Sequence, residues 1–255
     1  MRRVVIILVL VIILWAVFRL DRMAENWHYV LPAEPGELLY VASFDDDAPD
    51  WEQDEGNEIS SQIVDGAMRV TVNANSDGLY SAASPYFGDF DMKVAARVRQ
   101  GVFDGDNNNG YGIIFRQYDR ENYFIFLVSN DGSYRIMRVL EGRSSFPSAW
   151  ITTEAIHTLE GVVNQLRVVG DGDYFQFYIN GERVQLCIPD DPDGQSTMYD
   201  GICIGGSMQD TLVDDSMPFG RLGVAVQSDV GWPTGVVVDF DNVIVYGPQP
   251  IADNE

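Results

Sequence analysis

Arg116 is a charged residue at the end of the otherwise apolar segment YGIIF. If this segment is a β-strand, Tyr111, Ile113 and Phe115 share one face of it. Arg116 then lies on the opposite face, where a guanidinium group offers five planar N–H donors that suit sugar hydroxyls or carboxylates. In the alternative interpretation Arg116 ends its strand over solvent, or pairs with Asp119 or Glu121 across the turn, a contact worth little free energy. In both interpretations we expect Arg116 to face outward.

Aromatic side chains could complete a ligand-binding platform beside this arginine. Rings offer large, rigid contact surfaces, and tyrosine and tryptophan add a polar group that can form a hydrogen bond. The candidate ligand-binding aromatics are Tyr111, Tyr123, Tyr134, Trp150 and Trp232.

Other site chemistries have less support in the residue pattern. The stretch DGDNNNGYG from Asp104 is similar to a calcium loop, but its glycine falls one place late and Phe115 stands where an EF-hand has its glutamate. His157 has no serine in a nucleophile-elbow motif to work with. His28 is the other histidine, and neither lies near the cysteines in sequence, which argues against a metal site there.

Strand signals recur at short intervals from Leu38 onward and determine where these side chains point. Apolar and polar residues alternate in segments such as AMRVTVN and YFQFYIN, and Gly, Asn and Asp separate the segments. Asn180-Gly181 is a strong hairpin signal, because both central residues of a type I′ turn need positive φ. We find no convincing amphipathic helix of ten or more residues in this region. The pattern predicts a single antiparallel β-sandwich.

The order of these strands resembles that of a known superfamily. A "YGIIFR" strand, a "NYFIFLVSNDGSYRI" hairpin, a "FQFYING" hairpin and a closing "VVVDFDNVIVY" strand are similar to concanavalin A-like jelly rolls. Within that superfamily the chain looks most like laminin G-like and 3-keto-disaccharide hydrolase (family 16 glycoside hydrolase-like) domains. The resemblance covers residues 38–247 and implies two curved antiparallel sheets, with ligands on the concave face or the edge loops. It does not decide function, because many such domains are binding modules.

One departure from that superfamily's enzymes bears on catalysis. Family 16 glucanases carry a Glu-x-Asp-x-x-Glu strand motif, whose glutamates act as nucleophile and acid/base. The motif is absent here, and the nearest acidic strand supplies Asp239 and Asp241 but no glutamate. We therefore expect no catalytic residues of this kind.

Two acidic clusters form a candidate calcium site. Asp45 and Asp47 follow the first strand of the domain, and Asp239 and Asp241 lie in the last. First and last strands are commonly neighbours in a jelly roll, so these carboxylates could meet. Calcium takes six to eight oxygen ligands, which such a joint could supply. The alternative is a set of solvated acids in turns.

The net charge limits the possible partners. The chain has 39 acidic and 16 basic residues, which gives −23 at pH 7. Such a surface repels phosphate backbones, so we expect no nucleic-acid partner. It also disfavours docking on anionic lipid headgroups.

The N-terminal segment is the membrane candidate. Residues 4–18 are an unbroken apolar run of fifteen with arginines on both sides. At a rise of about 1.5 Å per residue a helix of this length covers roughly 22 Å, and snorkelling arginines can extend it. No clean small-x-small cleavage site follows, which favours an uncleaved signal-anchor over a cleaved signal peptide. In either case the rest of the chain lies outside the cytoplasm, anchored to the membrane, or secreted if the segment is removed.

The two cysteines agree with export. Cys187 and Cys203 have fifteen residues between them in a loop-rich stretch. In an exported protein we expect them to form a disulfide, which stabilises by roughly 3 kcal/mol in the loop-entropy model. Two free thiols are the alternative.

Four segments follow from these patterns: a signal-anchor or signal peptide over 1–20, a linker over 21–37, the sandwich over 38–247 and a tail over 248–255. The favoured function is a membrane-tethered, extracytoplasmic module that binds a glycan or another cell-envelope ligand without catalysis. The alternatives are a hydrolase acting on modified disaccharides, as the resemblance implies, and a structural domain of the cell envelope.

Overall fold

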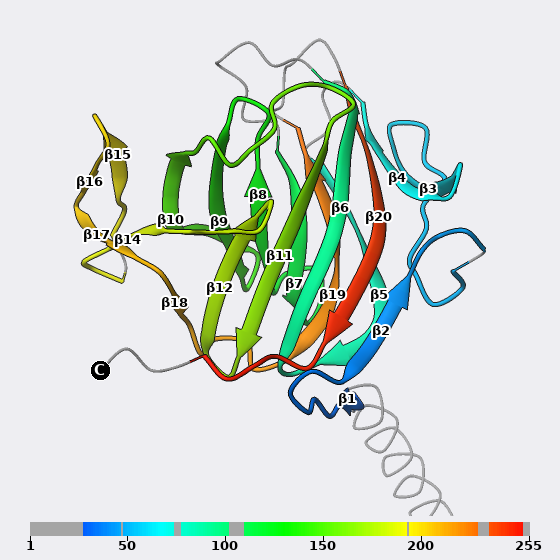
Figure 1. Cartoon of the computed structure of the whole chain (residues 1–255), viewed down its shortest axis with the longest axis horizontal. Coiled ribbons are helices and arrows are strands. Elements are labelled where there is room, and N and C mark those ends of the chain that lie inside the picture. The colour runs from blue at the N-terminus through cyan, green and yellow to red at the C-terminus, as the bar shows by residue number, and fades with distance from the viewer. Residues whose placement is uncertain are drawn as a thin grey trace, which may run out of the picture. The chain divides into compact units, whose positions relative to one another are not determined.

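The structure is a computed structural model, and it describes residues 28–46, 48–73, 78–101, 110–192, 194–228 and 235–251. The chain divides into two compact units, Met1–Val30 and Leu31–Glu255. In the described part of the second unit every regular element is a β-strand (Figure 1), which confirms the predicted all-β fold. No helix in the described part is long and apolar enough to cross a membrane. The predicted anchor over residues 1–20 lies outside the described residues.

Two large sheets form the sandwich. The first sheet has the strand order β1-β5-β19-β7-β8-β9-β10. Its strands span Val30–Leu31 (β1), Gly78–Phe87 (β5), Gly220–Gln227 (β19), Gly110–Gln117 (β7), Tyr123–Val128 (β8), Ser133–Leu140 (β9) and Arg143–Thr152 (β10). From β5 to β10 the neighbouring strands are antiparallel.

The second sheet has the order β13-β12-β11-β6-β20-β4-β3, with β18 beside β12 and β2 beside β20. Its strands span Glu182–Val184 (β13), Tyr174–Ile179 (β12), Val163–Asp171 (β11), Phe90–Gln100 (β6), Val236–Tyr246 (β20), Ala67–Val72 (β4), Ile59–Val64 (β3), Leu212–Val213 (β18) and Leu38–Ala42 (β2). The first and last long segments of the domain, β2 and β20, pair antiparallel, as expected from the resemblance.

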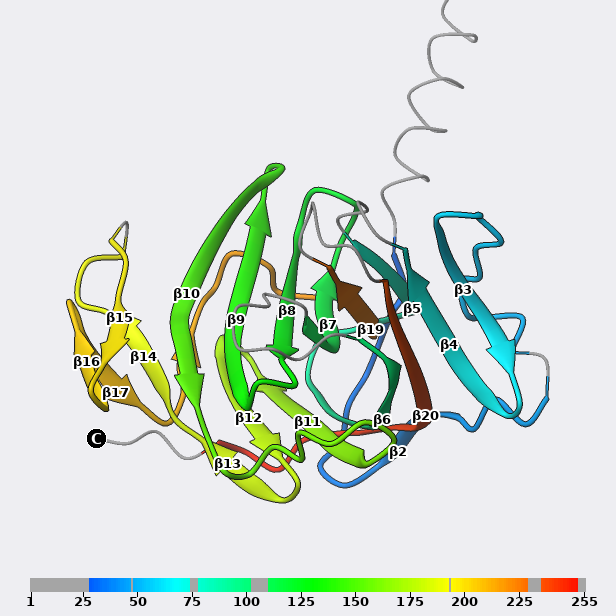
Figure 2. The ribbon, with the colours of Figure 1, turned by 90° about the horizontal axis from the view of Figure 1, so that it is seen from above.

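Two small hairpins lie beyond β10 (Figures 1 and 2). One pairs Leu186–Pro189 (β14) with Gly206–Gln209 (β17), and the other pairs Thr197–Tyr199 (β15) with Ile202–Ile204 (β16). A disulfide joins Cys187 in β14 to Cys203 in β16, with 5.5 Å between their Cα atoms. This confirms the predicted pairing.

The main core lies between the two sheets and is rich in phenylalanine. Phe115 of β7 packs against Phe124 of β8 and against Phe175 and Phe177 of β12, with ring centroids 5.2–5.9 Å apart. The predicted alternation of β12 is confirmed, since its Phe175, Phe177 and Ile179 are buried. The turn that follows has positive φ at Asn180 (50°) and Gly181 (88°), as the Asn-Gly signal requires.

A second, smaller apolar cluster covers the other face of the first sheet, which we call the outer face. Its buried members come from four neighbouring strands: Ile114, Ile125, Leu127, Met137, Val139 and Ala225. Tyr80, Tyr123 and Trp150 pack against them. This explains why the sequence of β8 is apolar on both faces: one side contacts the main core and the other this outer cluster.

The predicted outward orientation of Arg116 is wrong. Arg116 has a φ of 52° and is fully buried. Along β19, Arg221 and Gly223 are two positions apart, whereas their partners on β7, Gln117 and Ile114, are three positions apart. Arg116 is therefore the extra residue of a β-bulge, and the bulge breaks the alternation on which the expectation rested.

The Arg116 guanidinium lies among core side chains at the edge of the sandwich. Its Cζ is 5.7 Å from the Phe90 ring centroid and 5.4 Å from that of Phe175, and Nη2 donates to the Gly172 carbonyl at 2.8 Å. Burial, opposed by the charges of Asp89 and Asp173, lowers the pKa of Arg116 to about 10. The group is not presented to solvent, so it cannot contact a ligand from this position.

Candidate functional site

The Arg116 bulge directs the next residue, Gln117, to the outer face of the first sheet. Without the extra residue, Gln117 would share the inward face with Phe115, because strand side chains alternate. Gly220 makes the bulge possible, since a Cβ there would lie 2.2 Å from the Arg116 carbonyl carbon. The local backbone therefore positions a polar amide beside the turn that joins β7 to β8.

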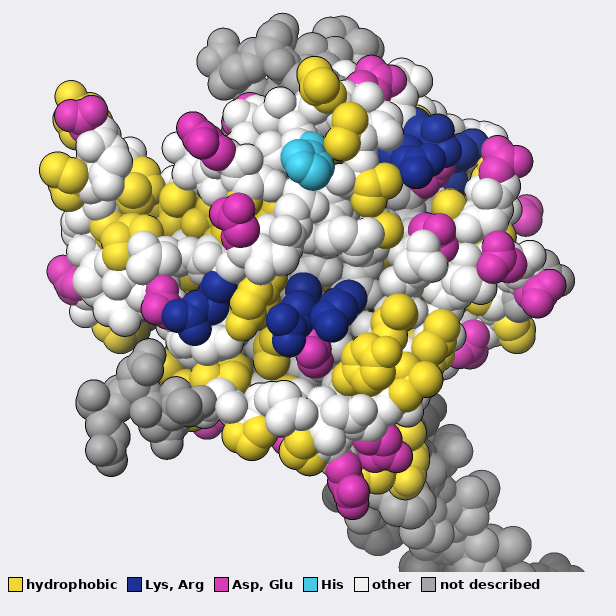
Figure 3. Space-filling view, in the orientation of Figure 1, with side chains coloured by type: hydrophobic (Ala, Val, Ile, Leu, Met, Phe, Trp, Pro, Cys, Tyr) yellow, Lys and Arg dark blue, Asp and Glu magenta, His cyan; other side chains and the backbone are white. Residues whose placement is uncertain are grey.

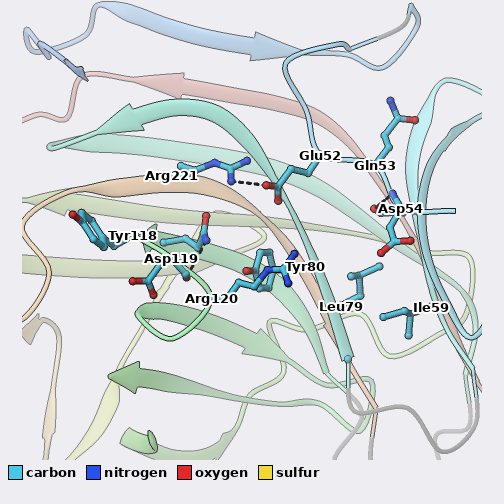
Figure 4. A pocket seen from close by; sticks show the side chains of 13 residues that line it. Glu52, Gln53, Asp54, Ile59, Leu79, Tyr80, Tyr118, Asp119, Arg120 and Arg221 are labelled. Atoms are coloured by element: carbon cyan, nitrogen blue, oxygen red, sulfur yellow. Dashed lines mark hydrogen bonds and ion pairs between the residues drawn. The ribbon is translucent and has the colours of Figure 1, made fainter. Parts of the chain in front are cut away.

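Gln117 lines a groove of about 690 Å³ along the β5 side of the outer face, which we call the β5–β7 groove (Figure 4). Its walls come from the segment before β3, from β3 and β5, from the β7–β8 turn and from β19. The lining residues are Glu52, Gln53, Asp54, Ile59, Ser61, Gly78, Leu79, Tyr80, Gln117, Tyr118, Asp119, Arg120 and Arg221. The groove thus combines aromatic rings with donors and acceptors of both charges, as small-molecule and sugar sites do.

Arg221 and Glu52 hold one wall of the groove together. Arg221 Nη1 contacts Glu52 Oε1 at 2.6 Å, and its Nε and Nη2 donate to the carbonyls of Ala83 and Ala82 at 2.7 and 2.9 Å. The two carbonyl contacts fix the planar guanidinium against the backbone of β5, and the ion pair ties it to the Glu52 side chain. This wall is therefore rigid before any ligand binds.

The β7–β8 turn forms the opposite wall. Asp119 Oδ1 accepts hydrogen bonds from the Glu121 backbone N–H and the Asn122 side chain, both at 2.8 Å. These bonds close an Asx-type turn and leave Asp119 and Arg120 exposed at the groove mouth. Arg120 also acts on Tyr80 across the groove, since its charge opposes the rise in the Tyr80 pKa.

Tyr80 of the groove forms an aromatic pair with Tyr123 of β8, with centroids 5.7 Å apart and planes tilted by 53°. Burial is the main cause that raises the pKa of both phenols, so both keep their proton at neutral pH. A neutral tyrosine can both donate and accept a hydrogen bond while its ring packs against an apolar surface.

Gln117 carries an unmet hydrogen-bonding capacity. Its side chain is 3% exposed, and its Nε2 donates to the Asp119 carbonyl at 2.9 Å. Its buried Oε1 has no partner. A buried acceptor without a donor costs about 1–3 kcal/mol. Because Oε1 is itself buried, a ligand hydroxyl recovers that free energy only if the Gln117 side chain turns toward the groove.

The predicted ligand-binding aromatics are divided between the two faces of the first sheet. Tyr111 and Tyr134 are buried in the main core, where Tyr111 Oη accepts from Asn164 at 2.8 Å and Tyr134 Oη donates to the Gln185 carbonyl at 2.6 Å. Tyr123 and Trp150 lie on the outer face and pack on the outer cluster. Trp232 lies outside the described residues.

The predicted calcium ligands are brought close only in part. Asp239 is buried and pairs with Arg69 (2.7 Å) and Arg99 (2.6 Å), so arginines compensate its charge. Asp241 accepts hydrogen bonds from Asn242. Burial is the main cause that raises the pKa of Asp241, and the negative charge of Asp45 raises it further, so Asp45 and Asp241 are close. Asp47 lies outside the described residues, and no group of three or more His, Cys, Asp or Glu in the described ranges could hold a metal. Calcium stays a prediction.

Sequence reasoning missed most of the groove. Glu52, Tyr80 and Arg221 are far apart in the chain, and each sits in an ordinary strand or turn pattern. The one local signal was the run Gln117–Asn122, which follows an apolar strand. Such a mainly polar run indicates that the side chains at the end of that strand are exposed. The bulge that turns Gln117 outward cannot be seen in the sequence, because the residue in left-handed conformation is an arginine rather than glycine.

Comparisons with known proteins establish the fold. No protein-family model matches the sequence, and neither does any curated protein. Among solved structures, the carbohydrate binding module CBM66 from Bacillus subtilis is 16% identical, with 77% of this chain and 95% of that chain covered at a TM-score of 0.52. A Bacillus subtilis protein of unknown function with a galectin-like fold is 10% identical, with 85% of this chain and 98% of that chain covered at a TM-score of 0.55. A native glycosidic hydrolase is 12% identical, with 87% of this chain and 100% of that chain covered at a TM-score of 0.52.

These similarities show the fold alone, a jelly-roll sandwich of the galectin-like kind, in agreement with the strand order. At such low identity they say nothing further about this chain. Its function has to be argued from its own site.

Proposed function

We propose that this domain is a non-catalytic glycan-binding module whose ligand occupies the β5–β7 groove. The observation that carries the proposal is the buried, unpartnered Oε1 of Gln117 in a groove that also holds Tyr80. A sugar offers what this arrangement lacks: hydroxyl donors for the free acceptor and an apolar C–H face for the ring. The carbohydrate-binding module of the same fold supports the proposal.

The carboxylates of the groove support binding rather than hydrolysis. A glycosidase needs two carboxyl groups free to act as acid and as base or nucleophile. Here Glu52 is paired with Arg221, and Asp54 accepts the Gly56 backbone N–H at 2.9 Å. Asp119 closes its own turn. Each carboxylate thus has a structural partner, and the groove offers hydrogen bonds without an evident catalytic pair.

On this proposal the module works outside the cytoplasm, held at the membrane by residues 4–18. The Cys187–Cys203 disulfide supports that location, because such bonds persist in oxidising compartments. The glycan is then one that the outer side of the cell encounters, such as a component of the envelope.

The test is a glycan-array screen of the full chain, followed by titration calorimetry with a glycan that binds. We expect Gln117→Leu and Tyr80→Ala each to weaken binding about tenfold, since each removes one hydrogen-bonding or aromatic contact. Matched controls are Gln165→Leu on the second sheet and Tyr199→Ala on the outlying hairpin, both at exposed positions. These controls should bind like the wild type.

Two outcomes would overturn the proposal. If no glycan binds, the domain is better explained as a structural element of the envelope. If a bound oligosaccharide is cleaved and the cleavage is lost in Glu52→Gln or Asp119→Asn, the domain is a hydrolase.

A further inference from the structure

Arg135 is a second arginine on the outer face of the first sheet, and its environment differs from that of the arginines described above. It lies in β9 opposite Leu127 of β8, on the same face as Tyr123 and Trp150. Tyr123 pairs with Val139, which is four residues farther along β9, so Arg135 lies about 14 Å from Tyr123 along the sheet.

Two aromatic rings of β10 hold the Arg135 guanidinium. Its Cζ is 4.1 Å from the ring centroid of Phe146 and 4.4 Å from that of Trp150. Stacking on ring faces fixes the plane of a guanidinium and leaves its N–H groups directed outward around the edge. Phe146 is 37% exposed, so this stack reaches the surface of the domain.

Arg135 has no anionic partner within the described part of the chain. Arg138, Arg167 and Arg221 each pair with a carboxylate at 2.6–2.7 Å, whereas the Arg135 side chain makes no ion pair or hydrogen bond with any described residue. Its Nε is buried and without a hydrogen-bond partner. Burial lowers the pKa of Arg135 to about 10, so the group still carries its charge at neutral pH.

A partly desolvated cation without a counter-charge is costly, and an anion that paired with it would recover that cost. The planar fork of N–H donors matches a carboxylate in bidentate geometry. The chain has a net charge of −23 and 39 acidic residues, yet none of the described carboxylates pairs with Arg135. The Arg135 guanidinium is therefore suited to bind an anion from outside the molecule.

The outer cluster connects Arg135 to the β5–β7 groove. Tyr80 of the groove, Tyr123 and Trp150 all pack on the same buried cluster, so the two sites belong to one rigid face. An extended oligomeric ligand that lies across this face can therefore contact both the β5–β7 groove and Arg135.

We propose that Arg135, held between Phe146 and Trp150, binds the carboxylate of an acidic sugar, so that the module selects uronic or sialic acid glycans over neutral ones. This inference rests on the proposed glycan-binding function and specifies its ligand class.

The test compares acidic oligosaccharides with the same oligosaccharides after methyl esterification, which removes the carboxylate charge and keeps the sugar. For example, oligogalacturonate is titrated against its methyl ester, and sialylated glycans against their esters on an array. We expect the wild type to prefer the acidic form about tenfold or more, and the preference to fall as salt is raised.

Arg135→Gln should abolish this preference, because it removes the positive charge that distinguishes the acid from the ester. Arg143→Gln is the matched control, because it removes the same charge from the exposed end of β10, where Arg143 pairs with Glu141. Arg143→Gln should keep the preference.

The possible failures are distinguishable. Equal binding of acid and ester by the wild type, or a preference that survives Arg135→Gln, overturns the role of Arg135 and leaves glycan binding intact. If neither form of any glycan binds, the proposed function itself fails, and the inference fails with it.

Discussion

At the scale of single residues, Arg116 and Arg135 show how far an arginine's role depends on its surroundings. Both lie in strands of the first sheet and both are largely desolvated. Arg116 points into the sandwich, where a backbone carbonyl and two phenylalanine rings surround it. Arg135 points outward between two aromatic rings, and within the described ranges its side chain has no anionic or hydrogen-bonding partner. The first therefore belongs to the architecture, and the second is available to a ligand.

Replacing Arg116 by methionine should not destabilise the domain. The buried guanidinium leaves Nε and Nη1 without partners, and its lowered pKa shows that burial outweighs the compensating charges. An apolar side chain of similar length removes that cost, while the exposed Gly172 carbonyl can bind water instead. We expect the free energy of unfolding to stay the same or rise by about 1 kcal/mol in chemical denaturation. A loss of more than about 2 kcal/mol would show that Arg116 is a net stabilising group.

Asp239 should contribute stability that depends on pH. Burial tends to raise the pKa of this carboxyl, but hydrogen bonds from Arg69 and Arg99 outweigh it and hold the pKa below its usual value. Such a group stabilises the fold above its unfolded pKa and loses that contribution as the pH falls through its folded pKa. Figure 3 shows basic side chains gathered in patches on the face of the second sheet that carries this network.

We therefore expect Asp239→Asn to lower the free energy of unfolding by about 2 kcal/mol at pH 7. The difference from the wild type should shrink below about pH 4, because the unfolded chain then binds a proton at this carboxyl, whereas the folded chain does so only at a lower pH. Denaturation at a series of pH values checks this. If the difference in the free energy of unfolding stayed constant down to pH 2, the charge of Asp239 would not be what stabilises the fold.

At the scale of elements, the hairpins beyond β10 depend on a covalent constraint. The strands β15 and β16 are short and exposed, with Tyr199, Ile202 and Ile204 largely in solvent. A two-stranded hairpin of this size is marginal by itself. The disulfide ties it to β14, whose Cys187 is fully buried in the main core.

Cys203→Ser should lower the free energy of unfolding by roughly 3 kcal/mol, the value for a loop of this length in the entropy model. Hydrogen exchange should rise first in β15 and β16, because they lose their link to the core. The sandwich strands should keep their protection. Unchanged exchange in the hairpins would show that non-covalent contacts suffice to hold them.

The joint between β2 and β20 is where the calcium prediction belongs. Asp45 and Asp241 repel each other there, whereas Asp239 is already neutralised by arginines. If calcium binds, the melting temperature should rise with calcium, fall with chelator and lose this response in Asp241→Ala. Asp239→Ala would not be a clean test, since it also breaks two ion pairs. A melting temperature that ignores the chelator would leave these acids as a solvated edge.

At the scale of the whole molecule, residues 4–18 are the proposed membrane anchor of the domain. An apolar run flanked by arginines, without a clean cleavage site, predicts that the segment stays attached. N-terminal sequencing of the protein from native membranes should then give the intact terminus. A mature chain that begins near Met23 or later would indicate a secreted module instead.

The sequence alone determined the fold class of this protein and much of its local structure. Period-two alternation and the Asn180-Gly181 turn predict strands and a hairpin, because these signals act between residues that are neighbours in the chain. The pairing of Cys187 with Cys203 was predictable too, since the chain has no other cysteine.

Only the tertiary structure decided which side chains form a site. The β5–β7 groove brings Glu52, Tyr80 and Arg221 together across pairings between distant strands, and no local pattern records such pairings. One left-handed residue, Arg116, reversed the facing of Gln117, because a bulge shifts every later side chain of its strand by one place. Whether an arginine is buried, paired or free depends on what packs around it, and that is a property of the folded chain.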